Sequence, residues 1–390
     1  MEGVASGSVT HVRVVQAHSK RGKSGHIWRA LGHQEGQIGW SGFIAKSILG
    51  TAPVEEDGSA FFEVPADRFV YFQLLDAEGR MVQSMRSGTT IHSGERRGCI
   101  GCHESREAGS VTMSSGRITM AMMRPPSRLR PWDGAPRRFN YLTEVQPVFD
   151  RNCLGCHDLG QGGEGGIVLA GDKNFGFNIS YCELQSRGLT GAIGAGPAGH
   201  LPALTWGSHA SPLVKLLQAG HPDDSGEKRV RLRRDEMERI ITWIDLNAPY
   251  YPTGYSARPG PLPGRNPLTR EETTRLFALT GLNDLVLGNA SHYTGPQVSF
   301  DRPHLSPVLG RIVDKGARTE AWAILQSGRE SLGRLPRADM PGFSVLHPRD
   351  EKARAHYEKY RAFEAKVREA IRTGGKVYDS PEADAVTMGL

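Results

Sequence analysis

The chain carries the pattern Cys-x-x-Cys-His twice, at residues 99–103 and 153–157. In this pattern two thiols add to the vinyl groups of one haem, and the histidine supplies an axial nitrogen to the iron. The chemistry needs this spacing, because two intervening residues allow the cysteines to reach both vinyl groups of one porphyrin. The sequence therefore predicts two haem c groups. Their predicted attachment and axial residues are Cys99, Cys102 and His103 for the first and Cys153, Cys156 and His157 for the second.

Other uses of the cysteines fit this pattern less well. Two Cys-x-x-Cys pairs can bind structural zinc, but zinc ribbons separate their pairs by about 15–20 residues, and the gap from Cys102 to Cys153 is far wider. A thioredoxin-like redox pair would be one Cys-x-x-Cys motif in a βαβ unit, and the sequence around these motifs does not have that pattern. Structural disulfides stay open as an alternative, because exported proteins carry them. The fifth cysteine, Cys182, lacks a partner and is expected to be a small buried side chain.

The motifs also bear on the compartment. Covalent haem attachment takes place outside the cytoplasm, so we expect an extracytoplasmic protein, in the periplasm or an equivalent compartment. Residues 1–7 show no charged region followed by an apolar one, so the export signal is not present in this sequence, and we expect a fragment of a longer exported protein. No apolar run is long enough to cross a bilayer. No motif supports nucleic-acid binding.

The net charge of +6 is modest for 390 residues. It suits docking to an acidic redox partner, and it suits equally a solvated surface with arginines near haem propionates.

The N-terminal part of the chain has the pattern of short strands. Val12 and Val14 alternate with polar residues, and an Asp-Gly turn at 57–58 precedes the apolar segment 60–64. Residues 69–83 add a second strand pair around an acidic turn. Short strands with regular turns predict a small β-sandwich-like domain, and the first haem motif follows at its end.

From Tyr141 onward the pattern is mainly helical. Residues 145–152 lead into the second motif, and residues 234–246 form an amphipathic segment that Pro249 ends. Four apolar residues share one face of that segment at helical spacing: Met237, Ile240, Ile241 and Ile244. This predicts a mainly α cytochrome c-like domain, in which the amphipathic helix closes one side of the core.

The predicted fold class is therefore α+β, in several domains. The predicted units are a β-rich domain at 1–110, a connector at 111–140, a cytochrome c-like haem domain at 141–255 and a mixed C-terminal extension at 256–390. The connector is rich in Arg, Ser, Pro and Met without a regular period, so we expect it to be extended. In the extension we expect helices at 269–280, 319–332 and 350–372.

The sixth ligand of the second iron is expected among the histidines that follow the motif. His221 lies between a short helix predicted at 211–217 and the amphipathic segment 234–246. Small cytochrome domains commonly place the distal ligand there, so His221 is the first candidate. His209 is the alternative distal ligand, and His200, His304 or an open position are further possibilities. For the first haem no distal ligand is evident, because His92 is expected in the turn before the motif.

Several segments resemble the hydrazine synthase alpha-subunit family. The segments that resemble its middle domain are 50–60, 64–67, 83–87 and 99–104, and those that resemble its C-terminal cytochrome domain are 145–150, 153–157 and 243–251. The resemblance covers at least residues 10–255. The family usually carries a β-propeller before the middle domain, and no propeller precedes residue 10 here, which also favours a fragment.

The resemblance has implications for both haems. It implies a bis-histidine second haem that serves electron transfer, in agreement with His157 and a downstream histidine. In hydrazine synthase itself, a tyrosine four residues past the first motif histidine binds the iron, and that histidine turns to zinc. The matching position here is Glu107, so ordinary ligation by His103 is expected, and the specialised nitrogen chemistry is not implied.

The leading hypothesis is a dihaem c-type cytochrome that mediates electron transfer within a hydrazine synthase alpha-like redox protein, with a redox partner protein or subunits. The alternative is an oxidoreductase that acts on a small nitrogen compound at an open first haem. A third possibility is a structural module in which haem only stabilises a small domain. A high-spin first haem that binds CO or NO would favour the oxidoreductase.

Overall fold

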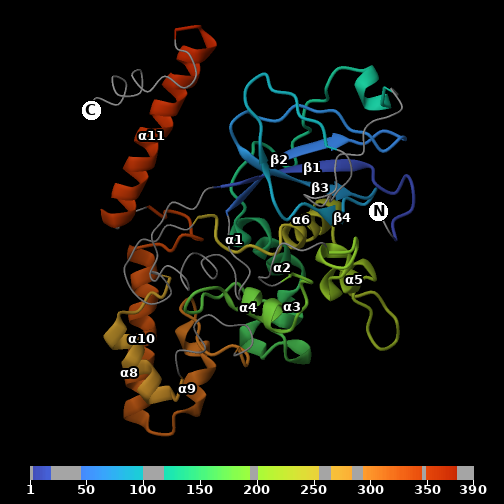
Figure 1. Ribbon diagram of the computed structural model, residues 1–390. Helices are drawn as coiled ribbons and strands as arrows, with labels where there is room; N and C mark the ends of the chain where they lie inside the picture. Colours follow the sequence, from blue (N-terminus) through green and yellow to red (C-terminus); the bar gives the residue numbers. More distant parts are fainter. Residues whose placement is uncertain are drawn as a thin grey trace.

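The computed structural model describes residues 3–18, 45–99, 118–193, 201–253, 265–282, 293–344 and 348–375. In these ranges the chain is an α+β protein, in which an antiparallel sheet lies against a layer of helices and a further helical unit lies beside that layer (Figure 1). The strands of the described sheet are β1 (His11–Ala17), β2 (Lys46–Pro53), β3 (Phe69–Leu75), β4 (Met81–Ser84) and β5 (Thr89–Thr90).

The sheet has two apolar faces. Its strands follow the order β2-β1-β3-β4, with β5 paired to β3, and every pairing is antiparallel. Successive side chains of a strand point to opposite faces, so neighbouring residues enter different clusters. One face carries Val14, Leu49 and Val70, and the other carries Val15, Ile48 and Tyr71. Each face must therefore be covered by another part of the chain.

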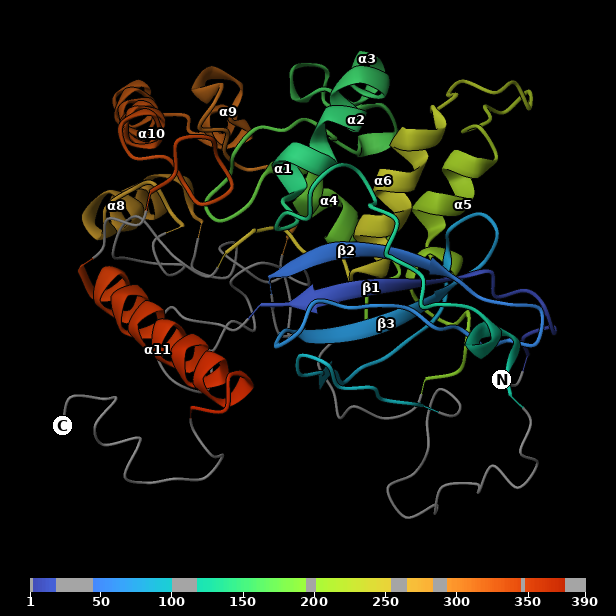
Figure 2. The same cartoon turned by 90° about the horizontal axis from the view of Figure 1, so that it is seen from above.

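Helices cover one of these two faces (Figure 2). The pattern of short strands predicts a second sheet in that position, as in a sandwich. The described strands form one sheet, and the layer with α1 (Tyr141–Glu144) and α6 (Arg234–Asp245) lies on it (Figure 2). Val15 and Tyr71 share one apolar cluster with Ile244 of α6. The sandwich prediction fails for these residues because strand alternation shows that a face is buried but not which element buries it.

The connector lies along the outer strand β2. Its described part, 118–140, exchanges backbone hydrogen bonds between Arg130 and Thr51 at 2.8 and 2.9 Å. Leu129 packs against the Val14 face of the sheet. Gly50 permits this close approach, because its φ is +142° and a Cβ there would lie 2.5 Å from the Arg130 carbonyl oxygen.

The helical layer holds the second Cys-x-x-Cys-His motif. Besides α1 and α6 it contains α2 (Gln146–Asn152), α3 (Leu154–His157), α4 (Ile179–Ser186) and α5 (Pro212–Gln218). The structure confirms the amphipathic helix as α6. It begins where Glu236 accepts the Arg233 N–H at 3.0 Å, and Ile240, Ile241 and Ile244 are buried.

An aromatic core fills the centre of this layer. Its fully buried rings are Tyr141, Tyr181, Trp243, Tyr250 and Tyr251. The polar tips of these rings find acceptors or partners, as buried polar groups require: Trp243 Nε1 donates to the Pro249 carbonyl at 2.9 Å, and the Tyr181 hydroxyl donates to the Ala248 carbonyl at 2.9 Å. The segment 243–251 is thus a packing element, in which one end of α6 and the following turn are fixed by aromatic side chains.

A buried polar network joins the sheet to α6. The Asp245 carboxylate lies 3.6 Å from the Arg13 guanidinium of β1. It also accepts the backbone N–H of Met81 at 3.0 Å and of Ser208 at 2.8 Å. The sheet and the helical layer therefore share both an apolar core and its polar contacts.

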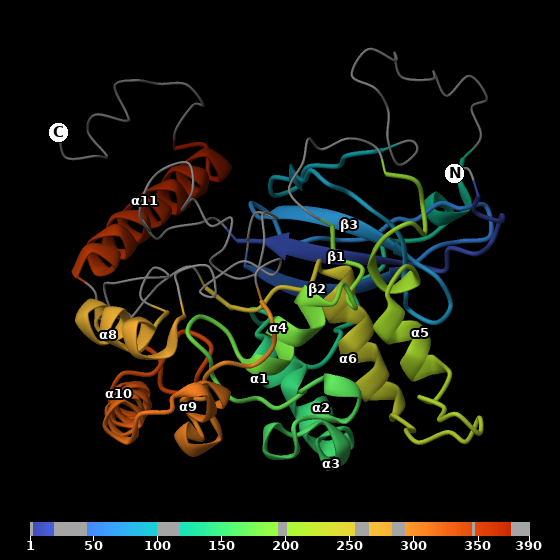
Figure 3. The same cartoon turned by 90° about the horizontal axis from the view of Figure 1, so that it is seen from below.

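The described C-terminal helices are α8 (Arg270–Thr280), α9 (Pro307–Arg311), α10 (Lys315–Arg334) and α11 (Pro348–Arg372). Of these, α8, α10 and α11 lie close to the three predicted segments. An apolar cluster joins α8, α9 and α10. The helices α8, α9 and α10 lie together beside the helical layer, and α11 lies at the periphery (Figure 3). Among the described residues, none of the helices is both long and apolar enough to cross a membrane.

Candidate functional site

The second Cys-x-x-Cys-His motif forms one helical turn. The helix α2 ends at Asn152, and Cys153 stands between it and α3. The backbone N–H of His157 donates to the Cys153 carbonyl at 2.9 Å, and that of Cys156 donates to the same carbonyl at 3.2 Å. Cys156 is exposed and Cys153 is half-buried, and both are free thiols. The turn therefore presents two thiols and an imidazole at adjacent positions.

The thiol of Cys153 is not activated for redox exchange. Burial raises its pKa to about 12, so the thiol is protonated at neutral pH. Reactive cysteines of thioredoxin-like proteins have a lowered pKa instead. This observation counts against the redox-pair interpretation of the second motif.

A backbone carbonyl orients His157. Its Nδ1 lies 3.1 Å from the Ile167 carbonyl oxygen, and Leu169 donates its N–H to the His157 carbonyl at 2.8 Å. A carbonyl accepts only from a protonated nitrogen, so this contact places a proton on Nδ1, and in the neutral ring the lone pair is then on Nε2. Metal-binding histidines commonly have this arrangement, because the hydrogen bond sets both tautomer and ring orientation.

His221 lies just past the end of α5 in a strained backbone conformation. Its φ is +49°, and that of Gly220 is +86°. The His221 N–H donates to the Leu216 carbonyl at 2.9 Å, which closes the helix end. Its Nδ1 is buried and has no hydrogen-bond partner among the described residues. A non-glycine residue with positive φ and an orphaned ring nitrogen is an indication of function.

The structure brings His157 and His221 together. Their ring centroids are 6.0 Å apart, with an angle of 60° between the planes. An imidazole nitrogen binds a transition metal at about 2 Å, and the ring centre lies about 1 Å behind it, so two axial imidazoles on one metal have centroids about 6 Å apart. The residues present therefore fit a bis-histidine iron beside the cysteines of the second motif.

The other candidate histidines lie elsewhere. His209 Nε2 is 3.0 Å from Asp76, and this contact ties it to the turn before β4. His304 is exposed in a short helix, and His200 lies outside the described residues. His92 contacts Asp67 at 2.8 Å. The ring contact of His157 is thus with the first candidate, His221.

The first motif is described only at its first residue. Cys99 is an exposed free thiol after β5. Cys102, His103 and Glu107 lie outside the described residues, so the attachment and ligation of a first haem stay predictions. Cys182 is buried in α4, as its sequence context predicts, and burial raises the pKa of its thiol.

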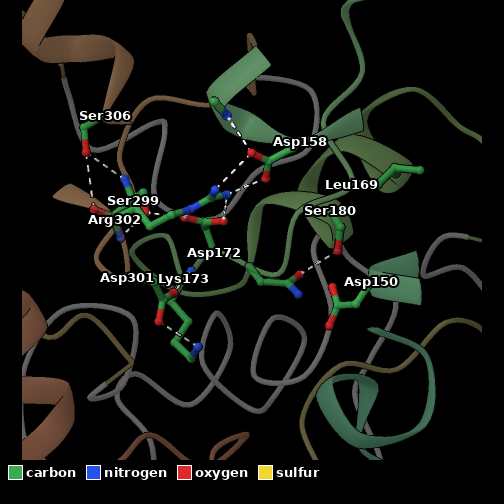
Figure 4. A network of polar contacts seen from close by, with 12 residues as sticks. Asp150, Asp158, Leu169, Asp172, Lys173, Ser180, Ser299, Asp301, Arg302 and Ser306 are labelled. Carbon is green, nitrogen blue, oxygen red and sulfur yellow. Dashed lines mark hydrogen bonds and ion pairs between the residues drawn. The ribbon is translucent and has the colours of Figure 1, made fainter. Parts of the chain in front are cut away.

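A charged network behind the second motif has no signal in the sequence. Arg302, from the C-terminal helical unit, lies between Asp158 and Asp172, and Lys173 pairs with Asp301 at 3.0 Å (Figure 4). Hydrogen bonds from Arg302 hold the pKa of Asp158 below its ordinary value. Asp158 adjoins the motif, but its partner is distant in sequence, so only the fold reveals the pair.

Arginines also line a surface cavity of about 640 Å³ beside α1, α2 and α6. Four of them pair with carboxylates. The paired arginines are Arg137, Arg151, Arg233 and Arg239. Glu144, which pairs with two of these arginines, is buried. The network therefore serves to fix the connector against the helices.

The fold and the site together define a class: an α+β protein in which a Cys-x-x-Cys-His turn and a second histidine lie in a helical layer on an antiparallel sheet. Residues 7–104 match the model of the hydrazine synthase alpha subunit middle domain. The match confirms the resemblance of this part of the chain to the middle domain of that family.

Among solved structures, the chain is similar to Kuenenia stuttgartiensis hydrazine synthase, with 19% identity and a TM-score of 0.45. The match covers 63% of this chain and 40% of that one, so the chain spans well under half of that protein's length. A comparison with curated proteins finds no match.

Proposed function

We propose that the chain is a dihaem c-type cytochrome of the hydrazine synthase alpha-like family, and that it transfers electrons. In this proposal Cys153 and Cys156 attach the second haem, and His157 and His221 are its axial ligands. The observation that carries the proposal is the 6.0 Å spacing of the two imidazole rings beside the motif cysteines. A bound haem would supply a reversible one-electron change of its iron.

The protein would hold the group through three contributions. The thiols attach it, and the carbonyl of Ile167 keeps His157 oriented. The backbone turn after α5 holds His221, which would supply the second ligand. Apolar side chains would lower the local polarity, because Cys153 packs against the main apolar core. Other side chains that pack against that core include Ile167, Leu189, Val230 and Met237.

For the first haem the proposal rests on the motif alone. Cys99 and Cys102 would attach it and His103 would bind the iron. A reaction of a small molecule at this haem is the second candidate function. One observation favours it: His92, the nearest candidate distal ligand in sequence, is held by Asp67 instead. The proposed setting is extracytoplasmic, with a redox partner protein or further subunits.

The proposal predicts different effects of two histidine substitutions. The chain is made in a host with haem-attachment machinery, and covalent haem is counted by the pyridine haemochrome assay and mass spectrometry. Two haems per chain are expected. H221A should convert one low-spin haem to a high-spin form that binds CO, because it removes an axial nitrogen. H209A should leave both haem spectra unchanged, because His209 contacts Asp76.

Electron paramagnetic resonance and CO difference spectra give the readout. Absence of covalent haem on Cys153 and Cys156 would overturn the proposal, and so would an H221A spectrum identical to that of H209A. Two low-spin, six-coordinate haems in the unmodified chain would exclude the second candidate function.

A further inference from the structure

One arginine closes the loop that follows the second motif. This loop, residues 158–172, begins at Asp158 and ends at Asp172. Arg302 donates from Nε and Nη2 to Asp172 at 2.8 and 2.6 Å. It donates from Nη1 and Nη2 to Asp158 at 3.0 and 2.6 Å (Figure 4). A single guanidinium thus joins both ends of the loop.

The closed loop carries the group that orients His157. Its Ile167 carbonyl accepts from His157 Nδ1, and its Leu169 N–H donates to the His157 carbonyl. The position of the imidazole therefore depends on the path of the chain between Asp158 and Asp172.

Arg302 is itself held in place. Ser299 Oγ accepts the Arg302 N–H at 2.8 Å and donates to the Asp172 carboxylate at 2.6 Å. Leu305, three residues further on, packs against an apolar cluster to which the loop itself contributes. That cluster contains Leu159, Val168, Ala170 and Ile179. The C-terminal helical unit therefore contacts the loop through both charge and apolar packing.

The geometry is more specific than that of an ordinary surface ion pair. Asp172 is only 6% exposed, and both of its oxygens are used by the guanidinium. Exposed single-contact pairs contribute little to stability, whereas the planar guanidinium can bind carboxylates through two parallel bonds. A lysine ammonium is a point charge, so it cannot reproduce the paired hydrogen bonds that Arg302 makes to each of the two carboxylates.

We propose that Arg302 is a positioning residue for His157. By holding both ends of the 158–172 loop, it keeps the Ile167 carbonyl on Nδ1, which would leave Nε2 free to bind the iron of the proposed haem. Loss of such an outer hydrogen bond weakens the bond between the imidazole and a metal. The inference rests on the proposed haem site at Cys153 and Cys156.

The test compares two arginine substitutions in the full haem-loaded chain. R302Q should speed the displacement of an axial ligand of the second haem by cyanide about tenfold or more, because outer-shell partners have effects of that size. It should also change the low-spin resonance signal. R302K should lie between R302Q and the unmodified chain. R275Q is the matched control, because Arg275 forms a two-bonded pair with Glu320 in the same helical unit.

The second haem is isolated by repeating the measurement in a C99A/C102A chain. If R302Q exchanges cyanide at the rate of R275Q and keeps the unmodified resonance signal, the proposal is overturned. D172N provides a milder test if R302Q fails to accumulate, because the bonds of Arg302 to Asp158 persist; an unchanged exchange rate in D172N also overturns it. Failure of the proposed function is distinguishable, because mass spectrometry would then find no haem on Cys153 and Cys156 in the unmodified chain.

Discussion

At the residue scale, His221 has one feature that can be read from the sequence and others that only the structure shows. Its position between two helices makes it a candidate ligand, and this position is legible in the sequence. Its left-handed backbone and its orphaned Nδ1 are not, because both depend on how α5 ends and on what packs over the ring. The carbonyl of Ile167 that orients His157 is equally hidden, since every residue has a carbonyl.

Asp245, in the segment 243–251, carries a buried charge that joins α6 to the sheet. Burial raises the pKa of this carboxyl, yet it contacts the buried Arg13 and two backbone N–H groups. D245N should reduce the free energy of unfolding by about 3–5 kcal/mol, because it leaves a buried guanidinium without its counter-charge. Urea unfolding followed by circular dichroism measures this.

The matched comparison is the double variant R13M/D245N. It removes both charges, so its loss of stability should be smaller than the sum of the two single losses. A double variant whose loss of stability equals the sum of the two single losses would show that the pair carries no such coupling.

At the scale of elements, the periodic patterns of the sequence predict individual strands and helices. They do not predict which kind of layer packs on the sheet. The strand alternation and the spacing of Ile240, Ile241 and Ile244 predict β1 and α6 correctly. The error concerns what covers the sheet, because an apolar face packs as well on a helix as on another strand layer. The path of the connector along β2 was also beyond the sequence, since it follows from the close approach that Gly50 allows.

This close approach gives a prediction for β2. G50A should lower the free energy of unfolding by about 1–3 kcal/mol, because a Cβ would meet the Arg130 carbonyl at 2.5 Å and the φ of +142° is strained for alanine. G58A is the control: its φ is +80°, but no atom lies within 4 Å of the added Cβ. Equal losses in chemical unfolding would contradict the role given to the contact.

At the scale of the whole molecule, the sheet and the helical layer are coupled through Lys46. This β2 side chain donates to the Leu246 carbonyl at the end of α6, at 2.6 Å. Burial lowers the pKa of Lys46 to about 8 from 10.5. Between these values the unfolded chain binds more protons than the folded one, so folding becomes more favourable as pH rises.

The prediction concerns the difference in the free energy of unfolding between the unmodified protein and K46M. The stability of the unmodified protein relative to K46M should increase as pH rises from about 8 to 10.5, and should be constant below that window. Urea unfolding at several pH values measures it. A difference that does not vary with pH would mean that Lys46 titrates normally in the fold.

The residues of the candidate site are synthesised in a fixed order, in which Arg302 comes last. Arg302 lies 144 residues beyond Asp158, and protein chains emerge from the N-terminus first. The motif thiols are therefore synthesised while the loop beside them still lacks its closing residue. In the proposed function, haem attachment at Cys153 and Cys156 can therefore precede closure of the loop by Arg302. A chain that ended before residue 302 would keep every motif residue but leave the imidazole on an open loop.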